Sequence, residues 1–259
     1  MAQFNDWCST AEEPVGNHLR RVMTGQTAQL PMGIQATAAI VPGHYASEEQ
    51  IARVLARLGK PHSAALVHGK LPTTKAIRSG DLGEIYATEW IDAHSGGYRA
   101  PIKRLRWKDH RNMAMRGDDV IGIRQDVQTQ RLHFLKTEAK SRAKLTAQVV
   151  SEARAALNKD FGLPSPHALS FISARLLELG NEPLADAIDD ALLKHGIPLQ
   201  NVQHLLFTFS GNAPHALLTA SLHGYAGPVK QWGVGLQVEG HGAFIGAVYD
   251  MVITNANNA

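Results

Sequence analysis

Hydrophobic residues recur with helical spacing in several segments of the chain. The clearest is 47–58, where Ser47 can cap the first turn, an apolar stripe follows at helical intervals, and Gly59 ends the pattern. Ser165 and Pro166 mark the start of another helix, and Gly180 ends it. The same spacing predicts helices over 79–91, 142–158, 166–179 and 183–195, and the last two form a helical hairpin.

Short apolar or β-branched runs bounded by turn residues predict strands. These runs cover 36–41, 99–107, 119–123, 132–140, 204–209, 233–238 and 244–253. Helices and strands alternate along the chain in an order typical of an α/β (α+β) fold, with a mixed central sheet flanked by helices. The turn at 126–130 would join two of the strands as a hairpin.

The composition indicates the cellular compartment of the protein but does not identify its activity. The single cysteine, Cys8, cannot form an intramolecular disulfide or a paired-cysteine zinc site, which fits a reducing compartment. The sequence shows no apolar run long enough to cross a bilayer and no Walker or serine-hydrolase motif. We therefore expect a cytoplasmic protein that does not bind a membrane.

Basic residues gather in one part of the chain, although the formal net charge is only +3. They are Arg99, Lys103, Arg104, Arg106, Lys108, Arg111 and Arg116, followed by Lys136, Lys140, Arg142 and Lys144. Such a cluster can hold the backbone of DNA, and Lys103, Arg104, Arg106, Lys108, Arg142 and Lys144 are the candidate DNA-binding residues. A solvated face with ordinary ion pairs explains the charge pattern equally well. Trp107, inside this run, is either a packing anchor or a platform on which a base stacks.

The triplet Glu138-Ala139-Lys140 is the first candidate for chemistry. Residues two apart on a strand point to the same side, so a carboxylate and an ammonium would lie together. A hairpin between 119–123 and 132–140 would bring Asp119 close to Glu138, because antiparallel neighbours lie about 5 Å apart. Two carboxylates at that spacing can share a hard divalent cation such as Mg²⁺.

An acid pair, a cation and a lysine form a set suited to phosphodiester hydrolysis. The metal would polarise the scissile phosphate and activate a water, while Lys140 would orient that water or stabilise developing negative charge. The alternative is a surface ion pair between Glu138 and Lys140 in an unrelated globular enzyme, where both residues could be replaced at little cost. The histidines lack the spacing of a metal site and are interpreted as individually satisfied or exposed.

The pattern of Asp119 followed by Glu138-Ala139-Lys140, between a helix with Glu84 and a basic helix, resembles the PD-(D/E)xK nuclease superfamily. The resemblance covers about 79–160 and implies a restriction-endonuclease-like core. It further implies that Asp119, Glu138 and Glu84 bind Mg²⁺ or Mn²⁺, and that these three residues and Lys140 are catalytic. Gln148 matches an auxiliary polar position more loosely. No proline precedes Asp119, and Asp118 stays open as an alternative metal ligand.

Three blocks, 79–84, 116–122 and 136–141, are similar to the HamA family, the nuclease subunits of the Hachiman antiphage defence system. This resemblance implies a Mg²⁺-dependent DNA endonuclease that forms a heterodimer with the helicase HamB and degrades DNA when the helicase releases or activates it. The corresponding division of the chain is an N-terminal α/β region, 1–75, and a nuclease domain, 76–259. A catalytically inactive DNA-binding or assembly subunit with the same fold is the alternative.

Overall fold

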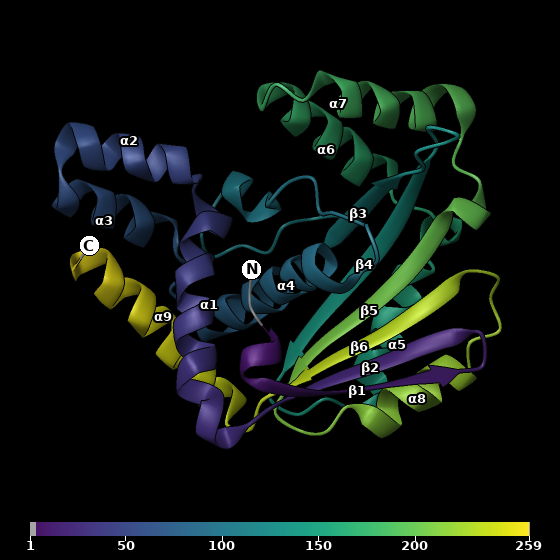
Figure 1. Ribbon diagram of the computed structural model, residues 1–259, viewed down its shortest axis with the longest axis horizontal. Coiled ribbons are helices and arrows are strands. Elements are labelled where there is room, and N and C mark those ends of the chain that lie inside the picture. The colour runs from purple at the N-terminus through teal and green to yellow at the C-terminus, as the bar shows by residue number, and fades with distance from the viewer. Residues whose placement is uncertain (1–3, 259) are drawn as a thin grey trace.

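The computed structural model describes residues 4–258, which form one six-stranded mixed sheet with helices on both faces (Figure 1). The strands follow the order β1-β2-β6-β5-β4-β3 across the sheet. The outer pairs β1–β2 and β3–β4 are antiparallel hairpins, and β2, β6, β5 and β4 pair in parallel. Their bounds are β1 Cys8–Val15, β2 His18–Gly25, β3 Val120–Gln125, β4 Leu132–Arg142, β5 Val202–Ser210 and β6 Lys230–Gln237.

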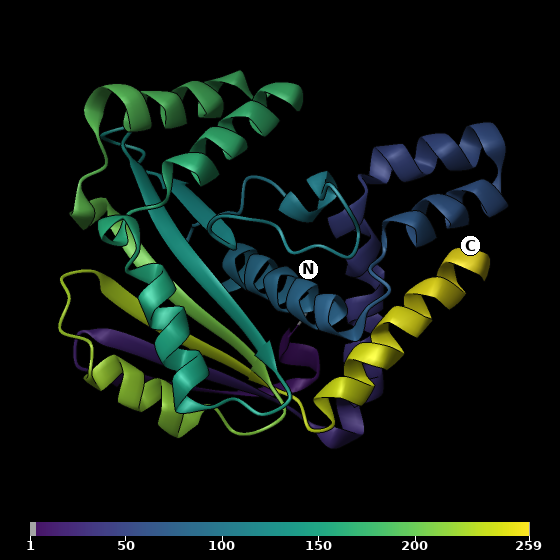
Figure 2. The same ribbon diagram turned by 180° about the vertical axis from the view of Figure 1, so that it is seen from behind.

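Helix α4, Lys75–His94, lies across one face of the sheet, while α5, Ala147–Leu157, and α8, His215–His223, cover the other face (Figures 1 and 2). Beside α4 stand α1, Leu30–Tyr45, and α9, His241–Asn258. The largest apolar cluster fills the space between these helices and the sheet, and includes the fully buried Trp90, Phe207 and Phe209. Burial of this surface is the main force that fixes α4 against β4.

Two helical hairpins project from this body (Figure 1). One consists of α2, Glu48–Leu58, and α3, Lys60–Lys70. The other consists of α6, Pro166–Glu178, and α7, Glu182–Asp189, which continues as a π-helical turn over Asp190–His195. A second apolar cluster joins α6 and α7 to β3 and β4.

The predicted α/β class is confirmed, as are several elements with their caps. The hydroxyl of Ser47 accepts the Gln50 amide at the start of α2, and Ser165 caps α6 in the same way. The hairpin of β3 and β4 turns at Asp126, whose carboxylate accepts the amides of Gln128 and Thr129.

Three predicted strands are wrong. Residues 36–41 belong to α1, whose buried positions recur three and four apart, and 244–253 belong to α9, where Phe244, Val248 and Val252 repeat every fourth residue. Both runs were assigned by apolar content alone, although their spacing is helical. Residues 99–107 form a loop in which only Arg99 makes a strand-like bridge, to Ile123, before the 3₁₀ turn Arg104–Trp107.

Both predicted chain regions contribute to the same sheet, since β1 and β2 precede residue 75 and β2 pairs directly with β6. The division at residue 75 stays a prediction from sequence. In residues 4–258, none of the helices combines the length and the apolar character needed to span a bilayer.

Candidate active site

The β3–β4 hairpin brings Asp119 and Glu138 together. Val120 pairs with Thr137, so Asp119, immediately before β3, lies beside Glu138 on the neighbouring strand. Oδ2 of Asp119 accepts the backbone N–H of Ala139 at 2.8 Å. The carboxylate of Asp119 is therefore held against the strand that carries the Glu-x-Lys triplet.

Lys140 and Glu138 lie on the same side of β4, as residues two apart on a strand do. The Lys140 ammonium donates to Oε1 of Glu138, and the two side chains are only 22% and 14% exposed. This partly buried pair differs from the surface ion pair considered as an alternative, because loss of either partner would leave the other poorly solvated.

Asp118 and Asp119 point to different partners. Oδ2 of Asp118 accepts the amide of Ser165 at 2.7 Å, and its other oxygen lies 3.5 Å from the ammonium of Lys136. Asp118 thus ties the start of α6 to β4, whereas Asp119 is directed at Ala139. This division of contacts favours Asp119 as the residue available for a metal.

Glu84, on α4, approaches Asp119 from the face of the sheet opposite to Glu138. The helix packs on the face of β4 that carries Ser141, since the hydroxyls of Ser79 and Ser141 are 2.8 Å apart. The Glu84 side chain is 13% exposed, and its Oε2 makes no hydrogen bond with any residue in the described range 4–258. The nearest cation is the guanidinium of Arg104, with Nε 3.5 Å from that oxygen.

The pKa values of all three acids are raised. Burial raises the pKa of Glu84 to about 8, against the opposing effect of Arg104 and with a further contribution from Asp119. Burial, followed by repulsion from Asp119, raises the pKa of Glu138 to about 7. Burial also raises the pKa of Asp119. Asp119 therefore belongs to two acid pairs, one with Glu84 and one with Glu138.

This arrangement fits a two-carboxylate site for a hard cation. Mg²⁺ takes one or two carboxylates, with water and substrate phosphate completing its shell, so Asp119 and Glu138 suffice. The buried Oε2 of Glu84 has Arg104 at 3.5 Å but makes no hydrogen bond in residues 4–258, and a nearby cation would relieve both this deficit and the raised acid pKa values. Within residues 4–258 no group of three or more His, Cys, Asp and Glu side chains is gathered for a metal, so Glu84 does not join the other two as a third ligand in this conformation.

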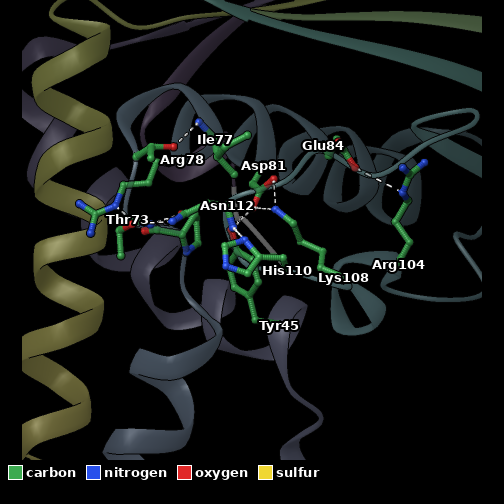
Figure 3. A network of polar contacts seen from close by, with 12 residues as sticks. Tyr45, Thr73, Ile77, Arg78, Asp81, Glu84, Arg104, Lys108, His110 and Asn112 are labelled. Atoms are coloured by element: carbon green, nitrogen blue, oxygen red, sulfur yellow. Dashed lines mark hydrogen bonds and ion pairs between the residues drawn. The ribbon is translucent and has the colours of Figure 1, made fainter.

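Much of the predicted DNA-binding run is folded onto α4 (Figure 3). Lys108 donates to both oxygens of Asp81, at 2.7 and 2.9 Å, and both side chains are only 4% exposed. Arg104 faces Glu84 and donates to the carbonyl of Asp119 at 3.0 Å. These cations stabilise the loop 99–118, and their charges are already partly compensated.

The other candidate DNA-binding residues divide in the same manner. Lys103 lies 3.4 Å from Glu89, and Nε of Arg106 donates to the Gly43 carbonyl at 2.9 Å. Arg142 and Lys144 are exposed where β4 leads into α5. Arg142 donates to the Ser141 carbonyl at 2.8 Å, and the side chain of Lys144 makes no hydrogen bond or ion pair within residues 4–258.

Gln148, the looser match to the superfamily pattern, makes its contact within its own helix. It is exposed on α5, on the other face of the sheet from α4, and donates to Glu152 at 3.0 Å. Two contacts went unnoticed in the sequence: Arg104 as the partner of Glu84, and a chain from Ser79 through Ser141 to the buried His241, with the last link 2.9 Å. The basic run was a signal for the first, but nothing in the sequence indicated the second.

A cleft of about 510 Å³ opens beside Asp119, between the loop 102–121 and α6. Its floor and walls are mostly apolar or aromatic, and Arg104, Arg116 and Asp118 contribute charge near Asp119. Asp119 therefore lines a pocket of the size that takes small ligands.

The mixed six-stranded sheet flanked by helices defines an α/β protein, and this fold is consistent with a nuclease-like core. The sequence model of the HamA family matches residues 4–252, which is nearly the whole chain. The chain belongs to the HamA family. It is similar to "Hachiman protein HamA" of Bacillus cereus, with 31% identity over 140 residues; the match covers 53% of this chain and about half, 48%, of that relative.

Proposed function

We propose that this protein is a metal-dependent DNA nuclease that acts in the cytoplasm as the effector of a Hachiman antiphage defence system. The observation that carries the proposal is the assembly of Asp119, Glu138 and Lys140 at one end of the β3–β4 hairpin. The name of the Bacillus cereus relative supports the defence role. The helicase HamB is the proposed partner, which would restrain the nuclease until DNA is to be degraded.

Asp119 and Glu138 are the residues that would hold Mg²⁺ or Mn²⁺. When bound, the ion supplies Lewis-acid polarisation of the scissile phosphate and a lowered pKa for the attacking water. The amide of Ala139 fixes the orientation of Asp119, so that one carboxylate is positioned before any ligand arrives. Preorganisation of this kind reduces the cost of binding the cation.

Lys140 provides the fixed positive charge of the site. It pairs with Glu138. With Glu138 as a metal ligand, the ammonium would be available to stabilise negative charge on the phosphate or to orient the water. Arg142 and Lys144, exposed just beyond, would hold the neighbouring phosphates without reading sequence.

The test compares Glu138→Gln and Lys140→Met with a matched pair from an exposed site, Asp190→Asn and Lys194→Met. Asp190 and Lys194 also form an acid–lysine contact, at 3.7 Å, but far out on α7 and its extension. Each protein is mixed with plasmid DNA and Mg²⁺ or Mn²⁺, with and without the helicase, and an EDTA arm is included.

We expect cleavage by the wild type and both control variants, loss of at least about 100-fold in Glu138→Gln and Lys140→Met, and no cleavage in EDTA. Equal degradation by Glu138→Gln and the wild type would refute the proposal. DNA retention that EDTA leaves unchanged, with no cleavage under any condition, would identify an inactive binding or assembly subunit instead.

A further inference from the structure

The cleft beside Asp119 has the lining of a nucleobase pocket rather than that of a duplex-binding groove. Its apolar wall is made by Ile102, Trp107, Met113, Met115, Phe171 and Ile172. Its charged lining consists of Arg104, Lys108 and Arg116 with Asp109, Asp118 and Asp119. A stacking surface and positive charge therefore lie in the cleft that Asp119 lines.

The two aromatic rings are held rigidly. Trp107 and Phe171 pack edge to face, with ring centroids 6.4 Å apart. The guanidinium of Arg175 lies over both rings, at 5.9 and 5.3 Å, and is itself paired with Glu178 at 2.6 Å. Both rings line the cleft and Arg175 does not.

One arginine of the cleft is available to bind the phosphate of a nucleotide. Arg104 is committed to Glu84 and to backbone carbonyls, but Arg116 is exposed, and its guanidinium makes no hydrogen bond or ion pair with any residue in the stretch 4–258. A strand with its base against Trp107 and Phe171 would bring its phosphate toward Arg116 and Asp119. Charge-assisted pairing of arginine with phosphate is strong and directional.

The size of the cleft decides between paired and unpaired DNA. A volume of about 510 Å³ falls in the range of small-ligand pockets. A base-paired helix, whose major groove alone is about 12 Å wide, does not enter such a space. Enzymes that do chemistry on a base admit a single unstacked nucleotide into a pocket walled by aromatic and apolar side chains.

We propose that this cleft binds an unpaired nucleotide next to the scissile phosphate, so that the protein selects single-stranded or frayed DNA. The proposal rests on the nuclease function above, but its binding step needs no metal and no cleavage. It assigns Trp107 as a stacking surface and Arg116 as a phosphate contact.

The experiment measures binding in EDTA, which separates the cleft from catalysis. Fluorescence anisotropy of a short dye-labelled oligothymidylate is compared with that of a labelled hairpin duplex. Ala114→Trp fills the cleft from its exposed rim, and Ala174→Trp places the same bulk on the exposed outer side of α6 as a matched control. Circular dichroism melting shows whether each variant is folded.

We expect Ala114→Trp to weaken oligothymidylate binding by about 5- to 150-fold, the range for loss of one stacked base, and Ala174→Trp to bind like the wild type. A second readout does not depend on Ala114. Oligothymidylate should quench tryptophan fluorescence in the wild type, and the quenching should be lost in Trp107→Phe, which keeps an aromatic ring and the fold.

Equal affinity of Ala114→Trp and Ala174→Trp for the oligothymidylate, or equal losses in both, would overturn the assignment of the cleft. Quenching that persists in Trp107→Phe, or a duplex that binds as tightly and quenches as strongly as the single strand, would do the same. If the protein does not cleave plasmid but Ala114→Trp still weakens oligothymidylate binding, the nuclease proposal is refuted and the nucleotide-binding cleft is supported.

Discussion

The buried acids make a sharp prediction about stability in the absence of metal. The carboxyl of Glu84 has its pKa raised from 4.5 to about 8, mainly by burial. Between these values the folded protein keeps a proton that the unfolded chain has released, so the free energy of unfolding decreases as pH rises. Glu84→Gln replaces the acid with a neutral amide of similar shape and should remove the part of this loss that Glu84 contributes, while the raised pKa values of Glu138 and Asp119 keep their own part.

The magnitude follows from the two pKa values. Each pKa unit corresponds to about 1.4 kcal/mol, so ionisation of Glu84 costs the folded state about 3 kcal/mol by pH 7 and about 5 kcal/mol above pH 8. At about 2–4 °C per kcal/mol for a chain of this size, Glu84→Gln should melt about 6–12 °C higher than the wild type at pH 7. At pH 4.5 or below the two proteins should melt within a few degrees of each other.

The assay is thermal and urea unfolding from pH 4.5 to 8.5 in EDTA, followed by circular dichroism. Glu182→Gln, an exposed acid at the start of α7, is the control and should follow the wild-type curve. A wild-type stability that stays flat or rises between pH 5 and 8, or a Glu84→Gln curve parallel to it, would refute the account of Glu84 as an acid whose burial outweighs its attraction to Arg104.

The same unfolding measurement, repeated with Mg²⁺ in place of EDTA, tests the proposed metal site. A cation that binds only the folded state stabilises it by about 2.7 kcal/mol at 100 times its dissociation constant. The wild type at pH 8 should regain stability when Mg²⁺ replaces EDTA, because Asp119 and Glu138 are then ionised and paired with the ion. Glu138→Gln should gain much less, and an equal gain in both proteins would show that the ion binds elsewhere.

Three further perturbations test the loop, the hairpin and the DNA contact. Lys108→Met leaves the buried Asp81 carboxylate unpaired and should cost about 3–5 kcal/mol in urea unfolding. Gly122→Ala should cost about 1–3 kcal/mol by the same measurement, because an added Cβ would meet three buried side chains at 3.0–3.3 Å. Replacing Arg142 and Lys144 together with alanine should weaken DNA binding and reduce the slope of log affinity against log salt by about 1.8.

Each of these has a control on the surface of the same protein. Lys194→Met removes an exposed partner and should change stability by less than about 1 kcal/mol. Gly246→Ala in α9, where an added Cβ meets nothing within 4 Å, should be neutral or stabilising. Arg57→Ala, exposed on α2, should leave the salt slope of DNA binding unchanged. If a control variant changed stability or the salt slope as much as its matched test variant, the structural explanation for that test variant would be refuted.

The sequence was informative where local chemistry decides the structure. Helix caps at Ser47 and Ser165 and the Asp126 turn require only neighbouring residues, and all three are present as hydrogen bonds. The approach of Asp119 to Glu138 was predictable for the same reason, since a short turn between two strands fixes their register. The hairpin and its acid pair therefore followed from a few local signals.

The strand predictions were wrong where they relied on the number of apolar residues and ignored their helical spacing. The C-terminal segment has many β-branched and aromatic residues, yet Phe244, Val248 and Val252 lie on one helical face that packs in the main core. The paired strands β1 and β2 were not predicted, because their sequences lack the pattern expected of strands. Six consecutive exposed positions in β1 give no alternating pattern, because this strand forms the edge of the sheet.

The basic run shows why charge along a sequence does not translate directly into a binding surface. Lys108 pairs with Asp81, which lies 27 residues earlier in the chain, and Arg104 pairs with Glu84. Both acids are on α4, so the tertiary fold determines these partners and neighbours in sequence do not. A cation that is buried with its acid adds little field at the surface. We therefore expect phosphate contacts from the exposed members alone, which are Arg116 in the cleft, Arg142 at the end of β4 and Lys144 just after it. DNA held by these three would lie along the β3–β4 end of the sheet, across Asp119 and Glu138.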